Sequence, residues 1–126
     1  MHVTSLPAKY GVGDFGPEAY KFADFLSAAG QNYWQMLPLN HTTAKTGFSP
    51  YNCSSAFAGN PLLISPDLLY EEGLLRKAEI STVPAFPAER ADFDKAVACK
   101  TELFDAAFAR FKSRPTPVDY EGFVDE

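Results

Sequence analysis

Residues 17–39 read PEAYKFADFLSAAGQNYWQMLPL, and the expectation for the whole chain starts from them. Pro17 and Glu18 are typical of a helix start, because proline is tolerated at the first helical position and a carboxylate is favoured at the positive end of the helix dipole. Apolar residues then recur at helical spacing, and Gly30 is a typical C-terminal cap. We therefore predict a helix over residues 17–29.

The second half of this stretch, residues 33–39, is short, rich in aromatic residues and stopped by Pro38. These features are typical of a buried strand. A helix followed after a few residues by a buried strand predicts a β/α repeat. The strand that precedes the helix should then lie near residues 2–5, where only a stub shorter than a typical strand is present. A further short strand is predicted over residues 62–64.

Residues 40–61 form a long segment rich in Asn, Thr, Ser, Gly and Pro, which predicts a loop. Loops of this length in compact proteins are usually either functional or disordered. Phe48, Tyr51 and Phe57 argue against disorder, because disordered segments contain few aromatic residues. We therefore expect a functional loop.

The rest of the chain is predicted to be helical with one linker. A short helix is expected over 66–72, and a linker containing two prolines over 78–89. A second long helix is expected over 91–112, where Lys100 interrupts an otherwise apolar face. Residues 119–126 have the pattern of a further helix that has just begun.

Composition excludes several classes of partner. The 126 residues carry a net charge of −5, and the eleven Lys and Arg are scattered rather than clustered. Nucleic acids and anionic membranes both require clustered basic residues, so neither is expected as a partner. No run of about 18 apolar residues occurs, which predicts no transmembrane helix. Cys53 and Cys99 lack the spacing of metal ligands, so no zinc site is predicted. A disulfide between them is the alternative, but two cysteines in an otherwise ordinary chain fit a reducing cytoplasm better.

The glycines of residues 11–16 match the G-x-G-x-x-G pattern of dinucleotide-binding proteins. Pro7 breaks the strand that should precede such a turn, and Pro17 removes an amide donor that a pyrophosphate would use. The predicted strand over 33–39 also carries no acidic residue for a ribose hydroxyl. A nucleotide-dependent oxidoreductase is therefore disfavoured, and we interpret the segment as a glycine-permissive turn in which Asp14 satisfies backbone amides.

Several uncommon words occur together in this chain: HVTSLP at 2–7, YGVGDFGPEAY at 10–20, GQNYWQMLPL at 30–39, and SPY at 49–51 leading to SAFAGNPLLI at 55–64. In this order and spacing they resemble the N-terminal region of 4-alpha-glucanotransferases of the amylomaltase type, glycoside hydrolase family 77. The resemblance is strong over residues 2–75 and looser afterwards.

The resemblance implies an α/β fold, a (β/α)8 TIM-barrel enzyme of which residues 1–126 form the N-terminal portion of one catalytic domain, incomplete at both ends. This portion would hold the first β/α units and inserted helices. The implied activity transfers a segment of an α-1,4-glucan to the 4-hydroxyl of another glucan or of glucose, so that α-1,4-glucans, maltodextrins and glucose are the expected partners. The implied mechanism is retaining and uses carboxylates, with neither a metal nor an organic cofactor.

In this family the catalytic acids lie well after the region of resemblance, so they are expected beyond residue 126 and the segment alone is expected to be inactive. A non-catalytic carbohydrate-binding module is the alternative, which the unfinished look of both ends disfavours. The acids inside the matched region are expected to have capping or surface roles: Asp14, Glu18, Asp24, Asp67, Glu71 and Glu72.

Ser49 and Tyr51 are the candidate substrate-binding residues. The resemblance implies that the Tyr51 ring stacks beneath the sugar next to the cleaved bond, since a phenol ring offers an apolar platform to the C–H face of a sugar. The Ser49 hydroxyl would bond sugar hydroxyls. The alternatives are that Tyr51 packs the long loop and that Ser49 caps a turn. Asn60 is expected to organise the backbone, and residues 45–48 depart from the Gly-Tyr-Gly-Asp segment of many amylomaltases, which puts an accessory glucan-binding tyrosine in doubt.

Overall fold

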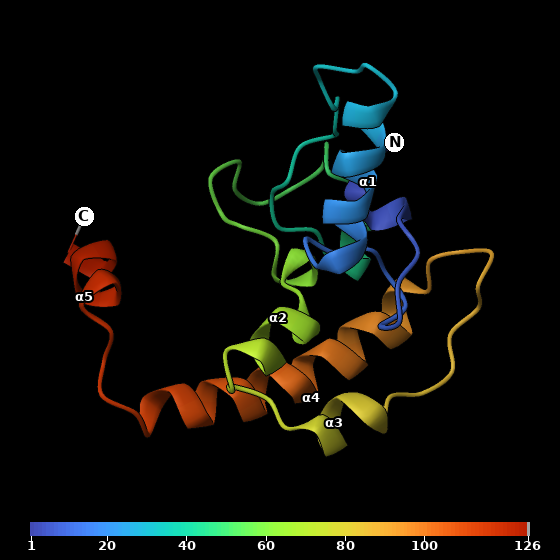
Figure 1. The fold of residues 1–126 in the computed structure, drawn as a ribbon. Coiled ribbons are helices and arrows are strands. Elements are labelled where there is room, and N and C mark those ends of the chain that lie inside the picture. The colour runs from blue at the N-terminus through green and yellow to red at the C-terminus, as the bar shows by residue number, and fades with distance from the viewer. Residues whose placement is uncertain (126) are drawn as a thin grey trace.

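The computed structural model describes residues 1–125 and is built from short helical elements joined by long connections (Figure 1). The described residues contain five α-helices and three short turns of 3-10 helix, labelled η. In chain order the elements are η1 (Val3–Ser5), α1 (Pro17–Ala28), η2 (Ala44–Thr46), η3 (Pro61–Leu63), α2 (Pro66–Glu71), α3 (Lys77–Ser81), α4 (Phe93–Lys112) and α5 (Val118–Asp125).

Helix α1 confirms the first prediction to within one residue. Its C-terminus forms a Schellman motif, in which the Gly30 amide donates to the Ser27 carbonyl and the Gln31 amide donates to the Leu26 carbonyl. Gly30 has a φ of 72°, which a residue with a Cβ seldom adopts. The helix therefore ends where the glycine was predicted to end it.

The other predicted helices are also present. Helix α2 begins with Ser65 as its N-cap, whose hydroxyl accepts from the Leu68 amide, and it ends in a second Schellman turn at Gly73. Helix α4 begins two residues later than the predicted range of 91–112 and ends at its predicted residue. The predicted linker over 78–89 is partly wrong, because its first residues belong to α3. Helix α5 lies beyond the C-terminal end of α4 in Figure 1 and contacts it through Tyr120, whose ring packs edge-to-face against Phe111 with 4.9 Å between centroids.

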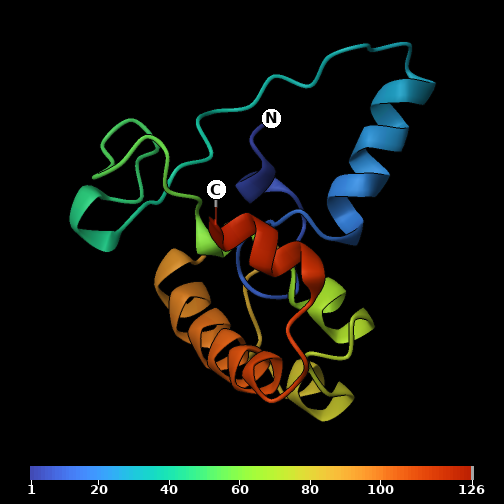
Figure 2. The same ribbon diagram turned by 90° about the vertical axis from the view of Figure 1, so that its left-hand side faces the viewer.

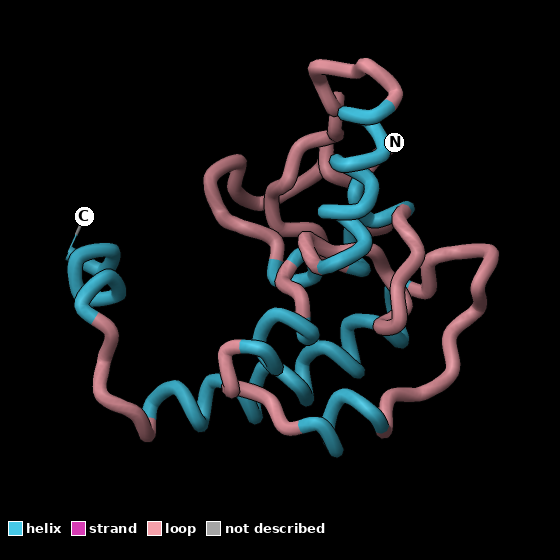
Figure 3. Tube along the Cα trace, in the orientation of Figure 1, coloured by secondary structure: helices cyan, strands magenta, loops and turns pink. Residues whose placement is uncertain are grey.

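The predicted strands are wrong for the described residues, none of which lies in a named strand (Figure 3). Residues 33–39 form an extended trace that leads from the end of α1 toward the loop (Figure 2). Trp34 and Met36 are partly buried, whereas Tyr33 is 92% exposed. This alternation has the period of a strand, but a strand also requires a paired neighbour, and within residues 1–125 the only bridge joins Asn40 to Gly59.

The segments predicted as strands near residues 2–5 and over 62–64 overlap η1 and η3 instead. In both places a backbone amide bonds the carbonyl three residues before it: Leu6 to Val3, and Ile64 to Pro61. A 3-10 turn satisfies its backbone locally and so needs no partner strand.

Two larger groups of buried side chains hold the elements together, beside a smaller one made of Val12, Leu62 and Ala96. One group lies where α2 and α3 meet α4 and includes Tyr10, Leu75, Ile80 and Leu103. The other packs α1 and η1 against the extended trace and contains Val3, Leu6, Ala19 and Leu63, with Phe22 and Trp34 in edge-to-face contact at 4.8 Å between ring centroids. The N-terminal turns and α4 therefore border the loop that follows residue 39.

Candidate functional site

The loop predicted to be functional is closed at its base by backbone and side-chain bonds; we call residues 40–60 the 40–60 loop. The His41 amide donates to the Ala58 carbonyl at 2.9 Å beside the Asn40–Gly59 bridge. The Asn60 side-chain amide donates to the Thr42 hydroxyl at 3.1 Å. Residues far apart in the loop are thereby joined, so the loop is an ordered structure with a defined base.

Ser49 and Tyr51 lie in one turn at the outer part of the 40–60 loop. The Ser49 hydroxyl accepts from the Tyr51 amide at 3.3 Å, and the Ser49 carbonyl accepts from the Asn52 amide at 3.2 Å. The Tyr51 side chain is 74% exposed. Ser49 therefore does cap a turn, whereas Tyr51 is mostly exposed to solvent rather than packed in the loop.

One flank of the loop rests on the start of α4. Phe48 adopts a φ of 55°, which is uncommon for a residue with a Cβ, and its ring stacks on Phe93 with 4.8 Å between centroids. Asn40, which is buried, donates to the Cys53 sulfur at 3.0 Å. These contacts fix the loop on both sides of the turn that carries Ser49 and Tyr51.

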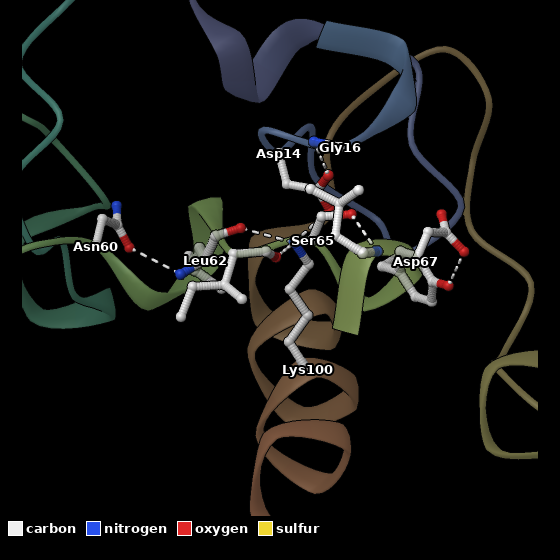
Figure 4. Close-up of polar contacts among 10 residues, drawn as sticks. Asp14, Gly16, Asn60, Leu62, Ser65, Asp67 and Lys100 are labelled. Carbon is white, nitrogen blue, oxygen red and sulfur yellow. Dashed lines mark hydrogen bonds and ion pairs between the residues drawn. The ribbon is translucent and has the colours of Figure 1, made fainter. Parts of the chain in front are cut away.

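Asn60 organises the backbone, as predicted. Its side-chain oxygen accepts from the Leu62 amide at 3.1 Å and so caps η3 (Figure 4), while its amide group donates to the Thr42 hydroxyl. One side chain thus joins the base of the 40–60 loop to the helical turn that follows it.

Lys100 is a feature that the sequence interpretation missed. Its side chain is fully buried, and its ammonium group donates to Asp14 Oδ2 at 2.7 Å, to the Leu62 carbonyl at 2.7 Å and to the Ile64 carbonyl at 3.0 Å (Figure 4). The second oxygen of Asp14 accepts from the Gly16 amide at 3.0 Å, as the predicted turn requires. Three segments therefore meet at one lysine: the turn before α1, η3 and α4.

Burial and ion pairing act in opposite directions on this pair. Burial raises the pKa of Asp14, and the neighbouring Lys100 ammonium opposes that rise. Burial lowers the pKa of Lys100, and Asp14 opposes that fall. Each charge therefore depends on the other, because a lone buried charge is strongly unfavourable.

The half-buried carboxylates of this region have structural partners. Asp14 is held by Lys100 and Gly16, and Asp67 accepts from the Tyr10 hydroxyl at 2.7 Å. Burial, and then the bond to Asp67, raise the pKa of Tyr10. Within residues 1–125 no group of three or more His, Cys, Asp or Glu side chains is placed to hold a metal ion.

The glycine motif forms a tight turn against η1 and α2. A Cβ on Gly13 would lie 2.0 Å from the Val3 carbonyl oxygen, and one on Gly16 would lie 2.3 Å from the Ser65 hydroxyl. The chain therefore packs too closely at Gly13 and Gly16 to leave room for a side chain at either position. Among the described residues no helix is both long and apolar enough to cross a membrane.

Beside the 40–60 loop, a cavity of about 310 Å³ separates the loop base from α4. Its walls include Thr42, Phe48 and Asn60 from the loop side and Lys100 and Phe104 from α4. The site as a whole consists of the exposed Tyr51 ring on an ordered loop that packs against helix α4.

Comparison with known proteins assigns the chain to a class of carbohydrate-active enzymes. The model of the glycoside hydrolase 77 family, described as 4-alpha-glucanotransferase, matches residues 1–126. The chain belongs to this 4-alpha-glucanotransferase family.

Individual relatives agree with the family match. The 4-alpha-glucanotransferase of Aquifex aeolicus is 46% identical over 112 residues, covering 89% of this chain and 22% of that protein. The 4-alpha-glucanotransferase of Synechocystis is 47% identical over 113 residues, covering 90% of this chain and 22% of that protein. The chain therefore spans about a fifth of the length of these curated relatives.

A solved structure also matches. Amylomaltase from Streptococcus agalactiae in complex with acarbose superposes with a TM-score of 0.82 at 39% sequence identity, over 90% of this chain and 23% of that one. The fold of most of the chain is thus one that an amylomaltase shares, although the described residues contain no named strand.

Proposed function

We propose that the whole protein containing residues 1–126 is a 4-alpha-glucanotransferase that moves a segment of an α-1,4-glucan to the 4-hydroxyl of a second glucan or of glucose. Membership of the 4-alpha-glucanotransferase family carries this proposal. The match to an amylomaltase in complex with acarbose supports a carbohydrate as the ligand class. Within this protein, residues 1–126 would be the N-terminal part of a (β/α)8 barrel domain.

Residues 33–39 support the barrel part of the proposal. Their backbone is extended, their side chains alternate between exposed and partly buried, and Pro38 ends the run. A backbone of this form becomes a strand once neighbours pair with it on each side. In a barrel the loop that follows such a strand lies at the C-terminal face, where active sites are built. In this proposal the 40–60 loop would hold that position.

In this proposal Tyr51 and Ser49 bind substrate and the chemistry comes from acids outside residues 1–126. The observation that supports Tyr51 is its exposed ring on a loop whose base is fixed. A retaining transfer needs a nucleophilic carboxylate and an acid/base facing one glycosidic bond, about 5 Å apart. The most buried carboxylate of this region, Asp14, is already committed to Lys100.

We propose a reducing compartment such as the cytoplasm for the protein, supported by two cysteines that are both free.

The activity is tested with the protein expressed from its complete reading frame and supplied with maltotriose. A 4-alpha-glucanotransferase converts maltotriose into glucose and longer maltodextrins, which chromatography resolves. If only binding of maltodextrin is found and no new chain lengths appear, the carbohydrate-binding module replaces the enzyme as the better interpretation.

The role of the ring is tested by Tyr51→Ala beside Tyr51→Phe in the same protein. We expect Tyr51→Ala to lower kcat/KM for maltotriose by about tenfold or more, which corresponds to about 1.4 kcal/mol of lost transition-state binding. Tyr51→Phe keeps the stacking surface and should retain most of the activity. Equal losses in the two variants would refute stacking, and unchanged kinetics in both would remove Tyr51 from the site.

A further inference from the structure

Lys100 uses its whole hydrogen-bonding capacity inside the protein. An ammonium group has three donors and no acceptor. In Lys100 these three donors reach Asp14, the Leu62 carbonyl and the Ile64 carbonyl, all within 3.0 Å. The residue is 0% exposed, so bulk water has little access to these bonds.

The two carbonyls belong to the segment on which the 40–60 loop ends. Leu62 lies in η3 and Ile64 directly after it. The Leu62 amide donates to Asn60, and Asn60 in turn donates to Thr42 on the opposite side of the loop base. The chain of contacts therefore runs without a gap from Lys100 to η3, to Asn60 and into the base of the loop.

Helix α4 also contacts the 40–60 loop at a second place. Phe93, at the start of α4, stacks on Phe48, which lies three residues before Tyr51. Lys100 and Phe93 are seven residues apart, which is two helical turns, so they lie on one side of α4. A single helix thus holds both the flank of the loop and the turn that closes it.

We propose that Lys100, paired with Asp14, is a positioning residue for Tyr51: by holding η3 against α4 it sets where the 40–60 loop presents its exposed ring. The inference rests on the proposed function, in which Tyr51 is a sugar platform. A displacement of about 1 Å at a substrate-positioning group can cost two orders of magnitude in rate. Loss of the ammonium group should accordingly act on substrate through Tyr51 and not only on folding.

The test variant must remove the lysine without leaving a buried charge behind. Lys100→Met alone would strand the Asp14 carboxylate, so we pair it with Asp14→Asn, whose side-chain oxygen can still accept from the Gly16 amide. The matched control is Leu103→Ala, on α4 one turn further on, in the cluster that faces α2 and α3 rather than the loop. Both proteins are expressed from the complete reading frame and studied well below their unfolding temperatures.

The first measurement needs no activity: hydrogen–deuterium exchange of the amides in the 40–60 loop. We expect the Asp14→Asn/Lys100→Met variant to exchange about tenfold or more faster in this loop than wild type, while the loop of Leu103→Ala stays within about twofold of wild type. Equal loop exchange in the two variants would overturn the proposal. This outcome is independent of whether the wild-type protein transfers glucan.

The second measurement is a double-mutant cycle with Tyr51→Ala, using kcat/KM for maltotriose. If the lysine acts through the ring, the Asp14→Asn/Lys100→Met change should lower kcat/KM about tenfold with Tyr51 present and less than about twofold in the Tyr51→Ala background. The same fold-loss in both backgrounds would overturn the positioning role. A wild type that forms no glucose from maltotriose would refute the proposed function instead, and the exchange result would still decide whether Lys100 holds the loop.

Discussion

At the scale of single residues, the local sequence pattern located Lys100 but did not predict its ion pair. The helical spacing of 91–112 predicted an apolar face with one polar interruption, and that interruption is a buried ion pair. Its partner Asp14 lies 86 residues away in sequence, beyond the reach of any local pattern. A lysine at a position that the spacing assigns to the core was the only available signal. Asp14 itself was predicted correctly as an acceptor for a nearby amide, because that bond is local.

The glycine turn gives a prediction at the same scale. Gly13→Ala should lower the free energy of unfolding by about 1–3 kcal/mol, because its Cβ would lie 2.0 Å from the Val3 carbonyl and the backbone would have to move. Chemical denaturation of the protein from its complete reading frame measures this change.

Gly59→Ala is the matched control for that prediction. Nothing lies within 4 Å of a Cβ placed on Gly59, and this residue is absent from the glycines with positive φ. We expect its effect on stability to stay within about 1 kcal/mol of zero. A loss at Gly59 as large as that at Gly13 would show that crowding is not the cause.

At the scale of elements, the helices were predictable because their signals are local. Proline and serine at helix starts, and glycines at helix ends, act within a few residues, and α1, α2 and α4 begin and end close to the predicted bounds. The strands were not predictable in the same way, since a strand exists only through pairing with distant residues. For the 40–60 loop, sequence predicted an ordered segment with Ser49 and Tyr51 in it. It did not predict that α4 supports the loop through Phe93 and Lys100.

The N-cap of α4 provides a test of this support. The Asp92 side chain accepts from the Lys95 amide at 3.2 Å. Asp92→Ala should destabilise the protein by about 0.5–2 kcal/mol, whereas Asp92→Asn keeps an acceptor and should cost less. Asp105→Ala, at an exposed position within the same helix, serves as the reference. Thermal unfolding compares the three, and an equal loss in all of them would argue against capping.

The contact between α3 and α4 predicts a dependence on pH. Arg110 donates to the Glu79 carboxylate, and this bond is the main cause that lowers the pKa of Glu79. The Glu79 carboxylate therefore binds a proton less tightly in the folded protein than in the unfolded chain. The stabilisation that the Glu79–Arg110 pair provides is complete above the ordinary pKa of Glu and is lost as the pH falls through the lowered pKa of Glu79.

Glu79→Gln should therefore reduce the loss of stability between pH 6 and pH 3. The difference should be about 0.2–1 kcal/mol, since both partners are partly open to water. Urea unfolding at several pH values measures it, with Glu71→Gln as an exposed reference outside the ion pairs of the described residues. A parallel acid dependence in wild type and Glu79→Gln would contradict the assignment.

At the scale of the whole molecule, much apolar surface faces outward. Tyr33 is 92% exposed and Phe57 is fully exposed, and Phe25 on α1 and Leu37 on the extended trace are exposed as well. Isolated exposed apolar residues are ordinary, but contiguous ones mark surfaces that another part of a protein covers. Among the described residues, none of 33–39 lies in a β-bridge, although the Leu37 amide donates to His2 Nδ1 at 3.2 Å, so this extended segment has no paired strand beside it.

We therefore predict that a polypeptide of residues 1–126 by itself is marginally folded. It should bind a hydrophobic dye such as ANS and show no cooperative unfolding in the range of about 45–65 °C that is common for mesophilic domains. Replacing Tyr33, Leu37 and Leu39 together by serine should reduce self-association, because these side chains supply the exposed apolar face of the extended trace. Calorimetry and sedimentation measure the two effects. A monomer that melts cooperatively in that range without binding the dye would show that residues 1–126 bury enough surface to fold alone.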